Sequence, residues 1–232
     1  AATILRGHAS EELAKVLILV DIVRSPPKLR SQQVGSMMTW FYDHLARLIY
    51  SDAQRWKPTD VRELQAYVDQ HRRSHYVEGD VGEYIMPNWT TWSRESLLYA
   101  DLVTYEDGEL VWHSPEAIMP SYYDSGPWQV CTALRDIGAL TRRGLDIVSS
   151  VWSQTDFKDC QHWSDTQRLT YEMLLGLEKA KLITEATSED QVRFLYDHWQ
   201  LPMYRIDFTR LEVPLEDLRT EQETRLWSEI GG

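Results

Sequence analysis

A long apolar stretch near the start of the chain constrains the fold more than any other feature. Residues 6–24 contain no proline and many strong helix formers, which predicts a single helix that ends before Pro26 and Pro27. From Leu13 to Val23 this helix is apolar almost all round, and only two charged residues interrupt it. Neighbouring elements must therefore cover it on most of its sides.

The same helix carries four polar residues, His8, Glu11, Glu12 and Lys15, within about a third of its circumference at roughly 100° per residue. Charges on a buried helix must be paired or must face a cleft. One interpretation is an ordinary surface pair between Glu11 and Lys15, which lie four residues apart. The other interpretation is a cleft between helices, with Glu12 and Lys15 expected to face into it.

The composition restricts the class of protein. With 232 residues, 43% of them hydrophobic, the chain is long enough for one large domain, or for one domain with a small appendage. A net charge of −12 argues against a protein that coats nucleic acid, because such a protein needs a basic surface. The charge does not exclude a small basic pocket. Two cysteines make no disulfide framework, and we find neither a signal peptide nor an apolar run of membrane-spanning length, so we expect a cytoplasmic protein.

Apolar residues recur at helical spacing along most of the remaining chain, which predicts a mainly α fold. Further helices are expected over residues 36–56, 60–77, 90–101, 128–152, 164–182, 188–198 and 215–230. Alternating residues on both sides of Asp107 and Gly108 predict a small β-hairpin near residues 102–113. The expected loops are residues 28–35, 78–89 and 114–127, and residues 203–208 fit an edge strand.

Acidic and histidine side chains also suggest a di-metal alternative. The candidate ligands form three pairs along the chain, His8 with Glu11, Asp43 with His44, and His71 with His75. A helical bundle can gather such groups, but the usual arrangement needs a glutamate three residues before a histidine on two of the helices. That pattern is absent from the sequence, so neither a metal nor any other cofactor is predicted.

Two further polar pairs lie later in the chain. Arg94 and Asp101 fall on one helix face, seven residues apart, and a structural interpretation makes them an ion pair that anchors the hairpin. Arg193 and His198 lie five residues apart, about 140° round a helix. These two residues share a site only if the helix ends there or another element fits between them.

Four motifs follow one another in the first half of the chain. They are Glu11-Glu12-Leu13-Ala14-Lys15, then Phe41-Tyr42-Asp43-His44-Leu45-Ala46-Arg47, then Arg94 to Asp101, and then a segment with Trp112 and Pro115. In this order they resemble the AbiV-type abortive-infection proteins of the HEPN superfamily, over about residues 1–115.

The resemblance implies a HEPN-like helical bundle over residues 1–150 with the hairpin as an insertion, and a C-terminal helical extension over residues 151–232 that either stands apart or packs into the same domain. It also implies prokaryotic antiphage defence or a toxin-type effector. Many such proteins are homodimers and metal-independent ribonucleases that halt translation. The expected partners are an RNA substrate, a second copy of the chain, and a protein such as an antitoxin, a phage protein or a defence-system subunit.

HEPN ribonucleases carry an arginine followed a few residues later by a histidine near a helix end. Here Tyr99 stands five residues after Arg94, where the family has histidine, and tyrosine is a poor base at neutral pH. The resemblance therefore implies catalytic roles for Arg94 and Tyr99, with His44 and Glu12 transferring protons from neighbouring helices. The supporting residues are Glu11, Lys15, Arg47 and Asp101, and the alternative catalytic pair is Arg193 and His198.

The missing histidine motivates a second hypothesis from a different class. A non-catalytic HEPN-like module would bind a protein partner or a nucleotide and would regulate a defence effector. A buried ion-pair network with no access from solvent would instead indicate that the cleft has only a structural role.

Overall fold

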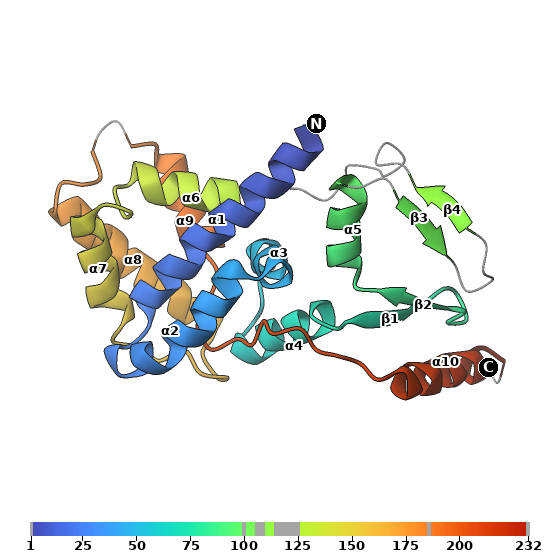
Figure 1. The fold of residues 1–232 in the computed structure, drawn as a ribbon. Helices are drawn as coiled ribbons and strands as arrows, with labels where there is room; N and C mark the ends of the chain where they lie inside the picture. Colours follow the sequence, from blue (N-terminus) through green and yellow to red (C-terminus); the bar gives the residue numbers. More distant parts are fainter. Residues whose placement is uncertain (1, 99–100, 105–109, 114–125, 185–186, 231–232) are drawn as a thin grey trace.

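The computed structural model describes residues 2–98, 101–104, 110–113, 126–184 and 187–230 of the chain. The described part is mainly helical with two small antiparallel sheets, so the predicted mainly α fold with a hairpin is confirmed (Figure 1). Within these ranges, no helix is both long enough and apolar enough to cross a membrane.

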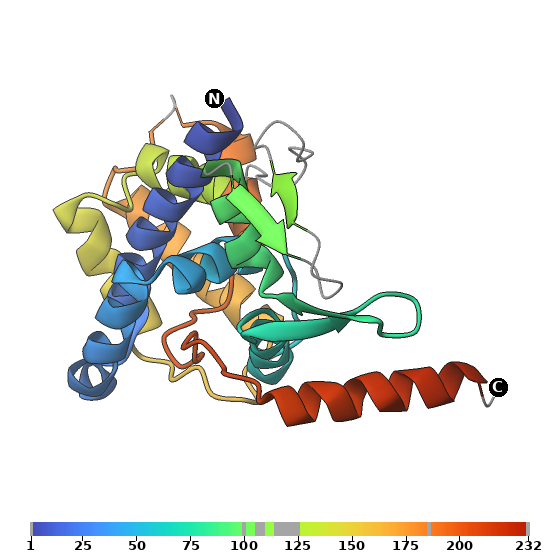
Figure 2. The ribbon, with the colours of Figure 1, turned by 45° about the vertical axis from the view of Figure 1, so that its right-hand side comes forward.

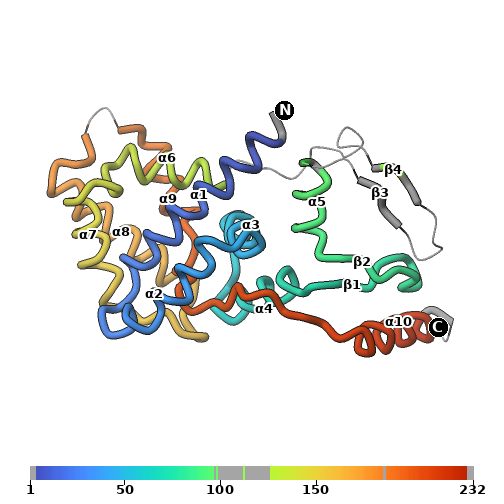
Figure 3. Tube along the Cα trace, in the orientation of Figure 1, coloured from blue at the N-terminus to red at the C-terminus, as the bar shows by residue number. Residues whose placement is uncertain are grey.

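The elements follow one another along the chain as Figures 1 and 3 show. The helices are α1 (Ala2–Arg24), α2 (Pro27–Tyr42), α3 (His44–Ala53), α4 (Val61–His71), α5 (Trp89–Leu98), α6 (Gly126–Asp136), α7 (Arg142–Trp152), α8 (Trp163–Lys179), α9 (Glu189–His198) and α10 (Leu215–Ile230). The strands are β1 (His75–Glu78), β2 (Tyr84–Pro87), β3 (Asp101–Thr104) and β4 (Leu110–His113). β1 pairs with β2, and β3 pairs with β4.

The first helix runs through the bundle, as its apolar composition predicts (Figure 1). α1 contacts α2, α3, α5, α6 and α7, and its side chains Leu17 and Ile18 are buried. Full burial of one such aliphatic side chain stabilises the fold by about 1.5–3 kcal/mol. Two acidic residues of α1, Glu11 and Asp21, are buried beside this core, where each of them needs a partner.

The single helix predicted over residues 36–56 is wrong, because the chain forms two helices there. The loop expected at 28–35 is also wrong, since Pro27 suits the first position of a helix and begins α2. α2 ends before Asp43, whose backbone is extended and whose carboxylate accepts a hydrogen bond from Ala46 N at 2.7 Å. This N-cap starts α3 in a new direction, with His44 as its first residue.

The helix predicted over residues 60–77 ends early, and a second hairpin follows it. α4 ends at His71, and residues 75–78 form β1. β2 lies in the segment that was expected to be a loop. Gly79 and Gly82 have φ values of +97° and +78°, which allow the chain to turn between the two strands.

The long helix predicted over residues 128–152 is also interrupted. α6 ends at Asp136, and Gly138 has a φ of +72° in the turn that follows. Thr141 then caps α7, because its hydroxyl accepts a hydrogen bond from Gly144 N at 3.1 Å. A side chain on Gly144 would collide with the Gly138 carbonyl, so the first turn of α7 can fold back on the preceding turn only because residue 144 is glycine.

The C-terminal part of the chain shares the hydrophobic core with the N-terminal part. Residues 203–208 are irregular rather than an edge strand, and most of their side chains are buried. The Phe208 ring packs against Trp40 and Tyr50, with ring centroids 5.3 Å apart in each pair. The boundary expected at residue 150 falls inside α7, and the core includes side chains from both sides of it.

The hairpin near residues 102–113 is present as β3 and β4, with Leu102 opposite Trp112. The turn expected at Asp107 and Gly108 lies outside the described residues, and so do residues 114–125 of the expected loop. The helix predicted just before this hairpin is α5, which ends at Leu98.

Candidate functional site

A buried carboxylate on α1 gathers polar side chains from two other helices. Glu11 is 3% exposed. Its Oε1 lies 2.7 Å from Arg94 Nε on α5, and its Oε2 lies 2.7 Å from both Arg47 Nη2 and His44 Nδ1 on α3. We call these four residues the Glu11 cluster. They come from three of the sequence motifs, which the fold brings together.

Two helix caps hold the partners of Glu11 in position. The Asp43 cap begins α3, so that His44 and Arg47 lie one turn apart on the same side. Asn88 caps α5 by accepting a hydrogen bond from Thr91 N at 3.0 Å. The Asn88 amide in turn donates to the carbonyls at the end of α4 and just beyond it, both at 2.7 Å. The start of α5, and with it Arg94, is therefore tied to α4.

The two arginines keep Glu11 ionised despite its burial. Burial alone would raise the pKa of this carboxyl, but hydrogen bonds from Arg94 and His44 and the charges of Arg94 and Arg47 outweigh it. The pKa of Glu11 therefore lies below its usual value of 4.5. With one negative and two positive charges, the cluster carries a net positive charge in an acidic protein.

The Nδ1 atom of His44 has two polar contacts that require opposite tautomers of the ring. Nδ1 lies 2.7 Å from a Glu11 oxygen and 2.6 Å from Arg47 Nη2. The ionised carboxylate accepts only and arginine donates only, so Nδ1 cannot serve both contacts at once. Arg47 Nη2 already donates to Glu11, so we take the tautomer in which Nδ1–H donates to the carboxylate. Nε2 then carries a lone pair. No described residue bonds Nε2, and the His44 side chain is 55% exposed.

The prediction that Glu12 faces into a cleft is wrong, whereas Lys15 is only 22% exposed and lies over the Phe41 ring. Lys15 Nζ lies 2.6 Å from Glu12 Oε1, and the Glu12 side chain is 65% exposed. The expected pair between Glu11 and Lys15 is also wrong, because Glu11 bonds to α3 and α5 instead. Adjacent residues on a helix point about 100° apart, so Glu11 rather than Glu12 supplies the buried carboxylate.

For two of the predicted site residues, Tyr99 and Asp101, the structure does not show whether they belong to the Glu11 cluster. Tyr99 lies outside the described residues, and of Asp101 the structure describes only the backbone, in β3. The ion pair expected between Arg94 and Asp101 is therefore untested, whereas Arg94 Nε is bonded to Glu11.

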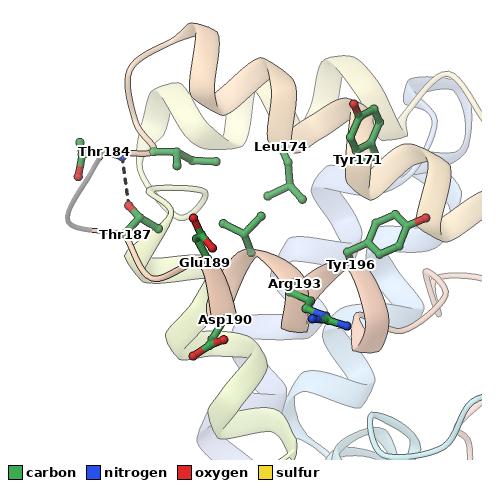
Figure 4. Close-up of a pocket in the computed structure, with 10 residues that line it drawn as sticks. Tyr171, Leu174, Thr184, Thr187, Glu189, Asp190, Arg193 and Tyr196 are labelled. Carbon is green, nitrogen blue, oxygen red and sulfur yellow. Dashed lines mark hydrogen bonds between the residues drawn. The ribbon is translucent and has the colours of Figure 1, made fainter.

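The alternative pair, Arg193 and His198, shows no direct bond between its members in the described structure. Arg193 is 84% exposed and lies 3.7 Å from Asp197. It lines a groove of about 870 Å³ between α8 and α9, near Tyr171 and Tyr196 (Figure 4). His198 instead stacks on the preceding turn of α9, with its ring 4.8 Å from that of Phe194.

The di-metal alternative finds no set of ligands in the part of the chain that the structure describes. No group of three or more His, Cys, Asp or Glu side chains converges there closely enough to hold a metal ion. His71 Nδ1 bonds to the Tyr67 carbonyl at 2.8 Å, and His75 Nδ1 lies 3.1 Å from the Ser74 hydroxyl.

A second ion-pair cluster on α1 was not predicted, although Asp21 visibly interrupts the apolar run. Asp21 Oδ1 lies 2.8 Å from Arg24 Nη1, and Oδ2 accepts hydrogen bonds from the Tyr50 hydroxyl and from Met203 N. We call Asp21, Arg24 and Tyr50 the Asp21 cluster. Burial raises the pKa of Asp21 and outweighs the opposing charge of Arg24.

The Asp21 cluster is closed on all sides. The Arg24 guanidinium lies against the rings of both Trp152 and Trp199, 3.8 and 4.2 Å from their centroids. It also donates to the Gln200 carbonyl at 2.9 Å. Asp21, Arg24 and Tyr50 are all nearly inaccessible to solvent. This arrangement is suited to stability and gives a substrate no access.

Comparisons with known proteins give no independent assignment: no family model, curated protein or solved structure matches the chain. Functional inference therefore rests on the residues of the Glu11 cluster and their geometry.

Proposed function

We propose that the chain is a metal-independent, HEPN-like ribonuclease that acts in antiphage defence by stopping translation in the cytoplasm. The observation that carries this proposal is the solvent-accessible imidazole of His44, oriented by a buried, ionised Glu11 and flanked by two arginines. Three of the four motifs that resemble AbiV-type proteins supply the members of this cluster.

His44 has the properties of a general base. Its Nδ1–H donates to Glu11, which fixes the ring and stabilises the imidazolium that forms when Nε2 takes a proton. In RNA the proton comes from a ribose 2′-hydroxyl, whose oxygen attacks the adjacent phosphorus. The bond to the 5′-oxygen of the next nucleotide breaks, and that oxygen takes a proton from solvent water, while the His44 imidazolium returns its own proton to solvent. The products are a 2′,3′-cyclic phosphate and a 5′-hydroxyl.

Arg94 has the properties of an electrostatic stabiliser of the phosphorane. Its Nε is bonded to Glu11, and its side chain is 17% exposed, compared with 6% for Arg47. A guanidinium can donate to two phosphate oxygens at once, which a lysine cannot do in the same geometry. Arg47 is more enclosed, so we assign it the role of positioning Glu11 and His44.

The test is cleavage of bacterial tRNA and ribosomal RNA in the presence of EDTA. Arg94→Ala is expected to reduce the rate by about 100-fold or more, and Arg94→Lys is expected to restore only a small part of it. A substrate with 2′-deoxyribose at the cleaved position is expected to stay intact. Cleavage that needs a divalent metal, or that proceeds equally well at a deoxyribose, would contradict the mechanism.

A second candidate function is a non-catalytic module that binds a protein partner or a nucleotide and regulates a defence effector. Both oxygens of Glu11 are fully engaged by side chains of the chain itself, which is what a structural ion-pair network needs. This candidate predicts no cleavage of any RNA and a stable complex with a partner. The homodimer that the resemblance implies is tested separately, by measuring the molecular mass of the protein in solution.

A further inference from the structure

The region around α10 is strongly acidic, and neither the Glu11 cluster nor the Asp21 cluster accounts for this negative charge. α10 runs away from the bundle beside the β1–β2 hairpin (Figures 1 and 2). Residues 75–87 and 215–230, which we call the acidic arm, carry eight acidic and two basic side chains. The arm therefore holds half of the chain's net charge of −12 in 29 of its 232 residues.

Specific contacts hold the two parts of the arm together. Leu218 is buried where α10 meets the hairpin. Arg73, just before β1, lies 2.8 Å from Glu221 on α10, and Gln222 donates to the Gly82 carbonyl at 2.8 Å. The hairpin turn thus lies beside the middle of α10, and the arm is a defined surface rather than a free tail.

The arm exposes apolar side chains as well as charges. Tyr84 on β2 is 52% exposed, and on α10 Leu215 is 52%, Leu226 41% and Trp227 69% exposed. The hairpin turn lies against Gln222 and Arg225 of α10, whereas the nearby side chains of Leu226 and Trp227 remain exposed. Exposed aromatic residues surrounded by polar ones are typical of protein interfaces.

We propose that the acidic arm docks a basic amphipathic segment of a partner protein. Lysine and arginine side chains of such a segment would complement the exposed Glu78, Asp80 and Glu223, and its apolar face would cover Leu226 and Trp227. The same negative charge repels nucleic acids and anionic membranes, which selects a basic protein as the occupant. This inference does not depend on the proposed ribonuclease activity.

The electrostatic half of the proposal is tested with a fluorescently labelled synthetic helix of leucine and lysine. The arm variant E78K/D80K/E223K is compared with D159K/E178K/E189K, which reverses three exposed charges outside the arm and changes the net charge equally. The arm variant is expected to bind the peptide about 10-fold more weakly than the matched variant. Equal affinity of the two variants would show attraction to the overall charge only and would overturn the proposal.

The apolar half is tested with two exposed tryptophans, of which only one lies on the arm. Trp227→Ala is expected to weaken peptide binding by about 10-fold, whereas Trp128→Ala, at a residue 59% exposed on α6, is expected to have no effect. Circular dichroism checks that both variants fold. Equal effects of the two substitutions, or equally tight binding of a leucine and glutamate helix, would overturn the proposal.

Discussion

The Glu11 cluster and the Asp21 cluster are built from the same chemistry on the same helix, and they differ in their access to solvent. Each has a buried carboxylate on α1 that is bonded to arginine and to a residue of α3. In the Asp21 cluster every member is buried, and two tryptophans enclose the arginine. In the Glu11 cluster the carboxylate is buried, but His44 is 55% exposed.

The two clusters also differ in net charge. One carboxylate faces one arginine in the Asp21 cluster, so the charges cancel. Two arginines face one carboxylate in the Glu11 cluster, which leaves a positive charge beside an accessible imidazole. A buried, balanced pair contributes to a unique fold, whereas an unbalanced cluster open to solvent can bind an anion. We therefore assign stability to the Asp21 cluster, and the proposed chemistry to the Glu11 cluster.

The largest expected effect on stability is that of Arg24→Ala. This substitution leaves Asp21 buried without its ion-pair partner and removes the guanidinium that packs against two tryptophans, so we expect a loss of about 3–5 kcal/mol in the free energy of unfolding. Urea denaturation measures it. The control is Arg168→Ala, which removes an exposed pair with Glu172 on α8 and should cost about 0.5 kcal/mol or less. Similar losses in the two variants would contradict the structural role of the Asp21 cluster.

Tyr50→Phe is expected to have a smaller effect in the same cluster. It removes the hydroxyl that donates to Asp21 but keeps the buried ring, so the expected loss is about 1–3 kcal/mol. RNA cleavage should be unchanged once the protein is folded. A variant of full stability, or one with a specific defect in cleavage, would remove the distinction between the two clusters.

The two carboxylates are expected to respond to pH in opposite directions. The pKa of Glu11 is lowered on folding, so its contribution to stability is present above the usual pKa of 4.5 and is lost as the pH falls through the folded value. The pKa of Asp21 is raised on folding, so its contribution is present below the usual 3.8 and is lost as the pH rises through the folded value.

The measurement is the free energy of unfolding of wild type and Glu11→Gln between pH 7 and pH 3. The difference between the two proteins should be greatest at pH 7 and should shrink below about pH 4.5, where Glu11 of the unfolded chain takes up a proton while Glu11 of the folded protein still stays ionised. A difference that grows on acidification would show that burial dominates at Glu11 and that the arginines do not hold it ionised.

The smallest expected effect is that of Glu12→Gln. Glu12 and Lys15 form an exposed pair outside the Glu11 cluster, and such pairs contribute about 0.2–1 kcal/mol. Both the stability and the RNA cleavage of this variant should stay close to those of wild type. A large loss of cleavage would restore Glu12 as the functional carboxylate and would contradict the assignment of Glu11.

The sequence predicts the regular elements better than the breaks between them. The periodic run of α1 and the alternation around Asp107 and Gly108 predict a helix and a hairpin, both of which are present. The break at Asp43 is not predictable from apolar spacing, because the run continues across it. It depends on the extended backbone of Asp43 and on its bond to Ala46 N.

All four residues of the Glu11 cluster are predicted site residues, but the sequence leads us to expect Glu12 rather than Glu11 to face the cleft. The motifs identify His44, Arg47 and Arg94, and the fold brings all three together. Spacing on α1 cannot choose between the adjacent residues Glu11 and Glu12, because either could face the cleft. The choice depends on how α3 and α5 pack against α1, which is a property of the tertiary structure and not of the helix.

The most direct test of this account is the rate of RNA cleavage by His44→Ala, with His8→Ala as the matched control. Both histidines are exposed, but only His44 is bonded to Glu11. We expect His44→Ala to reduce cleavage by about 10²–10⁴-fold while it changes the free energy of unfolding by about 1 kcal/mol or less. His8→Ala should match wild type in both measurements. A folded His44→Ala protein that cleaves RNA at the wild-type rate would contradict the assignment of chemistry to the Glu11 cluster.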